Sequence, residues 1–190
     1  LQLYPRTRVP FNVTTEKSPG RTPPENVLVI TGGINLIIDV VEKNHRNALF
    51  GSGPVDLSAD RMVIWTQLND DQQLTTQLEQ SARAPLEVYL EGNIVIRQGL
   101  HVLRARRAIF DGREKRALVL DAHLEARLPD SRTPLRVRAE RIRQNGPKSF
   151  HAQNAWATTS PYGKPGFRLQ ASDIFLEQRL MPGWLNSPVA

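Results

Sequence analysis

The stretch Leu103-Arg104-Ala105-Arg106-Arg107-Ala108-Ile109-Phe110 decides the fold, because three other stretches of the chain share its pattern. The pattern is an apolar residue, a spacer, Ala, two mostly polar residues, usually another apolar residue, and a spacer. The other copies are Leu57-x-Ala59-x-x-Met62-x-Ile64, Val137-x-Ala139-x-x-Ile142 and Leu169-x-Ala171-x-x-Ile174-x-Leu176. Repetition of one short pattern along the chain indicates one supersecondary unit stacked several times. It favours a long continuous surface over a catalytic pocket.

The apolar pairs within each copy cannot all face one way along a regular strand. Side chains alternate between the two faces, so Leu103 and Ala105 share a face while Ala108 and Phe110 have the opposite parity. A bulge or corner between them resets this parity. We therefore predict a kink in each copy, at Asp60–Arg61, Arg106–Arg107, Glu140–Arg141 and Ser172–Asp173. In the third copy Gln144 stands where an apolar residue is expected. The alternative is that each copy is two short strands split by a turn.

Almost no segment has the periodicity of a helix of normal length, so the chain is predicted to be all-β, as a sandwich, roll or solenoid.

Residues 1–26 are Pro-rich and form an extended arm that either pairs along a sheet edge or is disordered. Residues 27–178 form the β domain, and residues 179–190 form a tail. A polar insertion at 67–83 is either a short helix or mobile. In 118–128 the apolar residues share one parity, which predicts that they share one face: Leu118, Leu120, Ala122, Leu124, Ala126 and Leu128. The predicted strands are Val27–Ile30, Ile34–Ile38, Val55–Thr66, Leu86–Gln98, Val102–Asp111, Leu118–Leu128, Leu135–Gln144, Phe150–Thr159 and Phe167–Gln178.

The chain of 190 residues carries a net charge of +6, from 25 basic and 19 acidic residues. The excess is concentrated between residues 97 and 143, where 13 Lys or Arg meet 6 Asp or Glu. Most of these cations are Arg, whose guanidinium matches phosphate and carboxylate geometry, so an anionic partner is one interpretation. A solvated outer strand face is the other. The candidate anion contacts are Arg104, Arg106, Arg107, Arg136, Arg138 and Arg141.

Catalytic motifs are not apparent in the sequence. His45, His101, His123 and His151 are isolated from one another, and zero Cys excludes thiolate chemistry and disulfides within the chain. Neither a phosphate-binding loop nor a G-x-S-x-G motif is present. We therefore expect no enzyme, no cofactor and no metal site.

Several segments resemble a known family. Glu91-Gly-Asn-Ile-Val-Ile-Arg-Gln-Gly99 followed by Leu103-Arg-Ala-Arg-Arg-Ala-Ile-Phe-Asp111 resembles the OstA-like periplasmic domain of the lipopolysaccharide-transport proteins LptA and LptD. The copy at Leu57-Ser-Ala-Asp-Arg-Met62 is similar to it as well. The last unit, 154–161 followed by 167–174, is similar to the segment in which the jellyroll of the outer-membrane translocon approaches its barrel. That family usually has Thr-Cys where this chain has Thr159-Ser160, so a disulfide of that kind is absent.

The resemblance implies a bent antiparallel β-jellyroll, or β-taco, that carries the acyl chains of lipopolysaccharide, or of a related acylated amphiphile, in a concave apolar groove. It implies a periplasmic, non-enzymatic bridge associated with the outer membrane, with other OstA-like jellyrolls paired edge to edge and an outer-membrane barrel component as partners. The alternatives are a fully packed core without a groove, a structural β-edge adaptor without ligand, and a basic nucleic-acid-binding domain, although we expect no nucleic acid. The groove candidates are Ile34, Leu36, Ile38, Leu57, Met62, Ile64, Ile94, Ile96, Leu103, Phe110, Leu118, Leu120, Val137, Ile142, Trp156, Leu169 and Ile174.

Overall fold

The computed structural model describes residues 2–8, 10–18, 25–38, 54–66, 86–111, 114, 116–127, 133–146, 149–160 and 165–177. Every regular element in these ranges is a β-strand, which confirms the all-β prediction. The strands are β1 (Gln2–Pro5), β2 (Asn12–Ser18), β3 (Glu25–Ile38), β4 (Val55–Thr66), β5 (Leu86–Gln98), β6 (His101–Asp111), β7 (Arg116–Ala126), β8 (Leu135–Gly146), β9 (Ser149–Thr158) and β10 (Leu169–Glu177).

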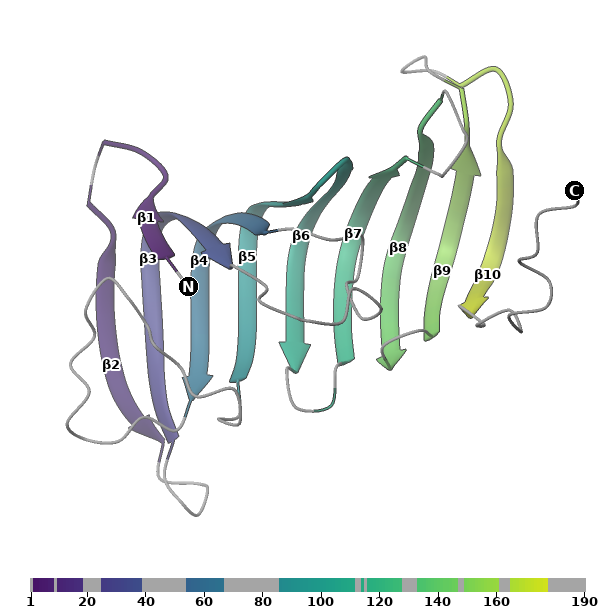
Figure 1. Ribbon diagram of the computed structural model, residues 1–190. Coiled ribbons are helices and arrows are strands. Elements are labelled where there is room, and N and C mark those ends of the chain that lie inside the picture. Colours follow the sequence, from purple (N-terminus) through teal and green to yellow (C-terminus); the bar gives the residue numbers. More distant parts are fainter. Residues whose placement is uncertain are drawn as a thin grey trace, which may run out of the picture.

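The ten strands form one antiparallel sheet that does not close on itself. From β3 to β10 each strand pairs with its neighbours in chain order, so the strands lie side by side in sequence (Figure 1). Both β1 and β2 pair with the free side of β3, β2 along residues 25–31 and β1 along residues 34–37. In the described residues the sheet therefore ends in β1 and β2 at one edge and in β10 at the opposite edge.

The burial pattern of β4 and β6 shows the predicted change of parity. In β4, Leu57 and Ala59 are buried, Asp60 and Arg61 are both exposed, and Met62 is again buried. In β6 the same sequence of buried, doubly exposed and buried positions surrounds 106–107. Each copy is nevertheless one continuous strand, so the alternative of two short strands split by a turn is wrong. The two consecutive outward residues let one strand present apolar side chains to the same side before and after its corner.

The positive-φ residues at these corners lie in the strands that pair with the repeat strands. Within the described strands, the residues with positive φ are Gly32 and Gly33 in β3, Gly92 and Asn93 in β5, Asp121 in β7 and Asn154 in β9. The pairing register shifts by one residue at the corners that join β3 to β4, β4 to β5 and β5 to β6. Gly32 and Gly33 therefore bend β3 without ending it, whereas the sequence predicted two strands there. Glycine and Asn or Asp tolerate this conformation better than other residues.

The arm predicted at residues 1–26 contributes β1 and β2. Of the two alternatives for this arm, the structure shows the one in which it pairs along a sheet edge. The insertion predicted at 67–83 and the tail at 179–190 lie outside the described residues.

The hydrophobic core lies on the inner side of the bend, between β3 and β7. Its largest fully buried side chains are Leu28, Ile30, Ile34, Met62 and Ile94. Leu3, from β1, and Phe11, just before β2, pack against this cluster, so the N-terminal segment helps to cover the core as well as the edge. We call the side of the sheet that carries this core the inner face and the opposite side the outer face.

Candidate functional site

The inner face is organised as rows of apolar side chains that cross the sheet from strand to strand. Cross-strand partners have side chains on the same face, so the register defines each row. The corner row is made largely of Ala, and two flanking rows lie on either side of it. One flanking row runs Leu36, Leu57, Ile96, Leu103, Leu124, Val137, Ala157 and Leu169. The other runs Ile30, Met62, Leu90, Ala108, Val119, Ile142, Ala152 and Ile174.

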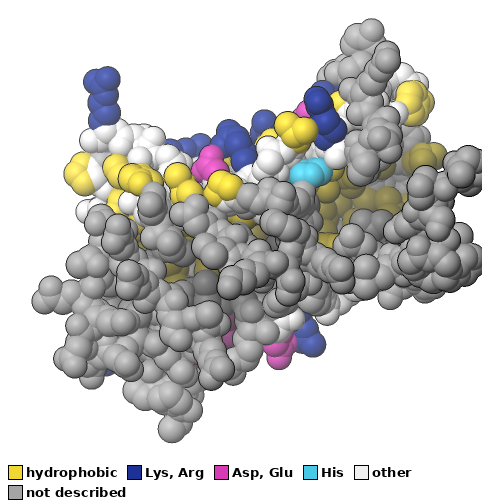
Figure 2. All heavy atoms as spheres, viewed as in Figure 1, with side chains coloured by type: hydrophobic (Ala, Val, Ile, Leu, Met, Phe, Trp, Pro, Cys, Tyr) yellow, Lys and Arg dark blue, Asp and Glu magenta, His cyan; other side chains and the backbone are white. Residues whose placement is uncertain are grey.

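These rows become more exposed toward the C-terminal strands. Leu36 and Leu57, in β3 and β4, are buried, whereas Val137 in β8 is half-buried and Leu169 in β10 is 77% exposed. Among the described residues of β8 to β10, the buried hydrophobic side chains are Ala139 and Ala155 alone. Figure 2 shows hydrophobic side chains in a recess toward this end of the bent sheet. The inner face is thus filled at β3 to β7 and open at β8 to β10.

Most of the predicted groove residues do lie on the inner face, but they divide into two groups. The first group is buried in the core and is not accessible to a ligand: Ile34, Leu36, Leu57, Met62, Ile64, Ile94 and Leu103. The second group is accessible on the same face: Ile96, Phe110, Val137, Ile142, Leu169 and Ile174. The side chain of Ile38 lies outside the described residues. Only the second group can form a binding surface.

The groove prediction is wrong for three residues, because they lie on the outer face: Leu118, Leu120 and Trp156. Leu118 pairs with Arg143, and Leu120 pairs with Arg141. The cause is the positive φ of Asp121, 53°, which places a corner inside β7 and resets the parity between Leu120 and Ala122. The same corner brings Val119 to the inner face, where it is 9% exposed, and the sequence pattern did not identify it.

Trp156 is held on the outer face between two cations. It pairs across the sheet with Arg138 and Gln170. The guanidinium carbons of Arg138 and Arg168 each lie 6.0 Å from its ring centroid, at the limit of a cation–π contact. Its ring therefore cannot contribute to an inner-face groove.

The candidate anion contacts also lie on the outer face, away from the apolar recess. Several are already engaged: Arg106 pairs with Asp121 at 2.7 Å, and Arg107 with Glu91 at 3.3 Å. Arg141 donates to Gln153 Oε1 at 3.3 Å, and Arg136 donates to the Ser160 carbonyl at 3.4 Å. Arg104 and Arg138 form no ion pair within the described ranges. An anion bound by these two residues would lie on the opposite side of the sheet from an acyl chain.

His123 lies between these two arginines in one outer-face row. Arg104 pairs with His123, and His123 pairs with Arg138. Partial burial, followed by the positive charges of Arg138 and Arg104, lowers the pKa of His123 below its usual value of 6.5. The imidazole is therefore neutral at pH 7, and the positive charge of this row comes from the two arginines.

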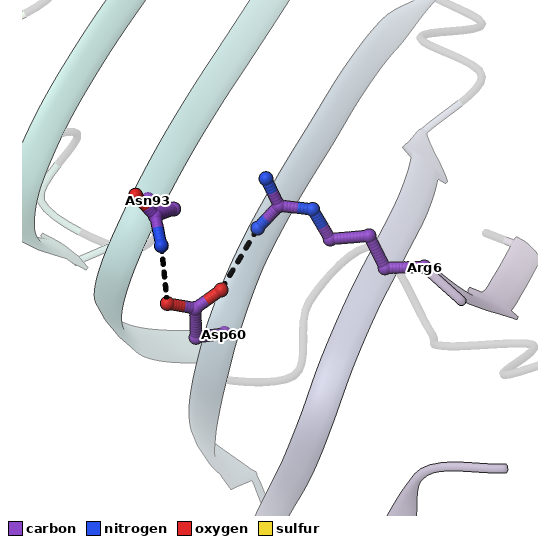
Figure 3. A network of polar contacts seen from close by, with 3 residues as sticks. All are labelled: Arg6, Asp60 and Asn93. Carbon is purple, nitrogen blue, oxygen red and sulfur yellow. Dashed lines mark hydrogen bonds and ion pairs between the residues drawn. The ribbon is translucent and has the colours of Figure 1, made fainter. Parts of the chain in front are cut away.

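Polar clasps hold the corners together. Asp60 accepts hydrogen bonds from Asn93 Nδ2 at 2.8 Å and from the Arg6 guanidinium at 2.9 Å (Figure 3). Glu140 accepts from Asn154 Nδ2 at 2.7 Å. In each clasp, as in the pair of Arg106 with Asp121, the residue after the repeated Ala meets a positive-φ residue of the next strand. The repeat pattern in the sequence identified the residue after each repeated Ala as part of a corner. It did not identify the positive-φ partner on the next strand.

The free edge at β10 carries exposed aromatic side chains. Phe167 and Phe175 are 62% and 74% exposed. Phe175 stacks on His151 with ring centroids 4.2 Å apart, and His151 Nε2 lies 2.8 Å from Asp173 Oδ1. In the described part of the chain β10 pairs only with β9, which leaves one side of its backbone available for another strand.

Neither a metal site nor a membrane-spanning helix is found in the parts of the chain that the structure describes. No three His, Asp or Glu side chains there lie close enough together to bind an ion. No described helix has the length and hydropathy required to cross a bilayer. Comparison with protein-family models and with curated proteins finds no match for this chain.

Proposed function

We propose that this chain is a non-enzymatic carrier or bridge domain for an acylated amphiphile. The acyl chains of that amphiphile would lie on the inner face of β8 to β10. The observation that carries the proposal is the change along the rows from a filled to an open apolar surface. A contiguous exposed apolar patch often marks a site of interaction. Each methylene that leaves water for it contributes about 0.8 kcal/mol.

The resemblance of the repeats to OstA-like domains makes lipopolysaccharide the first ligand to test, and it would place the protein in the periplasm beside the outer membrane. It also suggests assembly with other jellyroll domains and with a barrel component. The geometry of the edges is compatible with such assembly: in the described residues β1 and β2 pair only with β3, and β10 pairs only with β9, so each end of the sheet has strands with one unpaired side.

A photo-crosslinking amino acid at Ile142 tests the proposal. Ile142 is half-buried on the inner face, and Leu118 is half-buried on the outer face, which makes a matched control. With purified lipopolysaccharide we expect an adduct at residue 142 and none at residue 118. Equal labelling at both positions, or none at residue 142, would contradict the proposal.

A β-edge adaptor without ligand is the second candidate, and the exposed Phe167 and Phe175 at the free β10 edge favour it. The two candidates differ in what the inner face does. If the crosslinker at residue 142 captures no lipid while the protein forms edge-paired oligomers, the adaptor explains the chain. Solution scattering measured on the same samples would report those oligomers.

A further inference from the structure

Gln144 interrupts an apolar row on the inner face with a buried polar group. In the same position of the repeat, the other described side chains are Ile64 and Phe110. Gln144 pairs across the sheet with Ala117 on one side and Phe150 on the other, and Ala117 pairs with Phe110. The residue is only 5% exposed.

Among the residues that the structure describes, the side-chain carbonyl oxygen of Gln144, Oε1, has no hydrogen-bond partner. A buried acceptor without a partner destabilises the folded state, because it gives up hydrogen bonds to water and gains none. Ile or Phe at this place would cost nothing of the kind, and the chain uses both at the equivalent positions. No hydrogen bond among the described residues therefore accounts for this acceptor.

The neighbours of Gln144 on the inner face are only partly buried. Its cross-strand partners Ala117 and Phe150 are half-buried, and so are Ile142 and Ala152 in the adjacent row. Gln144 therefore lies at the border between the packed core and the accessible part of the inner face. A ligand lying along β8 and β9 would pass Gln144 at this point.

We infer that Gln144 is a recognition residue that accepts a hydrogen bond from an N–H or O–H group of the bound amphiphile. The inference rests on the proposed function, and it narrows the ligand class. The preferred cargo would carry an amide or hydroxyl donor close to its acyl chains, and a plain hydrocarbon chain would leave Oε1 unpaired. Such a residue raises specificity by rejecting analogues that lack the donor.

The test uses two probes of equal length that differ in one donor, N-methyldodecanamide and methyl dodecanoate. Dissociation constants for both are measured by displacement of a fluorescent hydrophobic dye from the full chain. The variant is Gln144→Met, which keeps the length of the side chain and removes the acceptor. Gln170→Met is the control, because Gln170 is exposed on the outer face.

We expect the preference for the amide over the ester to fall about fivefold in Gln144→Met and to stay unchanged in Gln170→Met. An equal preference in wild type and Gln144→Met would overturn the inference while leaving the apolar binding face intact. Failure of the wild type to bind either probe would instead overturn the proposed function, and the inference with it.

Folding of the variants is a second readout. Loss of an unpaired buried acceptor should leave the melting temperature of Gln144→Met and Gln144→Leu equal to or above that of the wild type. If both variants failed to fold, the amide would be serving the fold, and the inference would be overturned.

Discussion

The N-terminal half of the sheet, β3 to β7, and its C-terminal part, β8 to β10, are built from the same repeat but bury it differently. In the first half the inner rows carry large aliphatic side chains that fill the bend, such as Ile34 and Met62, both 0% exposed. In the second part the rows carry Ala152 between half-buried neighbours and Ala157 between the half-buried Val137 and the exposed Leu169. The bend itself is therefore not what makes a binding surface. The sizes of the inner side chains and their place in the sheet together decide whether the inner face is a core or an accessible surface.

The largest expected difference between the two regions is in the free energy of unfolding. Ile34→Ala should lower it by ~2–5 kcal/mol, because a fully buried side chain leaves a cavity. Ile174→Ala removes the same atoms from a partly exposed position and should cost less than about 1 kcal/mol. Urea unfolding followed by circular dichroism measures both. Equal losses would mean that β10 is packed as tightly as β3.

The corner at Gly92 should be the next most sensitive position. Its φ is 77°, and a Cβ placed there would lie 2.5 Å from Asp60 Oδ2. Gly92→Ala should therefore cost about 1–3 kcal/mol. Gly99 also has a positive φ, 56°, but a Cβ there meets nothing within 4 Å, so Gly99→Ala is the control for backbone conformation alone. A loss at residue 99 as large as at residue 92 would show that contact with Asp60 is unimportant.

The polar clasps should contribute smaller amounts. Asp60→Ala removes the partner of both Arg6 and Asn93, and Glu140→Ala removes the partner of Asn154 alone. Because the Asp60 side chain is 49% exposed, solvent screens its ion pair, and we expect a loss of about 1 kcal/mol or less. The loss for Glu140→Ala should be smaller still. Thermal unfolding at low and high salt compares them, and only the Asp60 effect should shrink as salt rises.

The smallest expected effect is the pH dependence from His123. Its pKa in the folded state is lowered, so the unfolded state binds more protons as the pH falls below 6.5. His123 should therefore reduce stability progressively as the pH falls from 6.5 through the folded pKa. Replacing it with Gln should flatten the stability profile in that window. An NMR titration that placed the His123 pKa above 6.5 would contradict the assignment, and Arg138→Gln should raise it.

The repeat predicted the fold well, because side chains alternate between the two faces of a strand. The parity of the apolar residues therefore indicates which face they share. The corners at 60–61 and 106–107 followed from two adjacent polar residues between apolar pairs. In β7 the pattern failed, since Leu118 and Leu120 continue the parity of Ala122 only if no corner intervenes. Asp121 carries that corner, and one aspartate in a strand gives no local signal of positive φ.

Which inner residues are accessible could not be read from the sequence. Leu57 and Leu169 occupy the same position of the repeat, but one is 7% and the other 77% exposed. The difference arises from their places in the sheet, one between β3 and β5 and the other at the free edge. The outer position of Arg104 and Arg138 likewise follows from the register of β6, β7 and β8 and not from their spacing along the chain.

The central claim is that one face of one sheet is a packed core at β3 to β7 and a ligand-binding surface at β8 to β10. The chain contains no Cys, so single cysteines can be placed along one row, at Leu57, Leu103, Val137 and Leu169, with Leu118 as the outer-face control. The rate of thiol labelling is then measured with and without lipopolysaccharide. We predict slow labelling at 57 and 103, fast labelling at 137 and 169, and protection by the lipid at 137 and 169 but not at 118. Uniform rates along the row, or no protection anywhere, would contradict it.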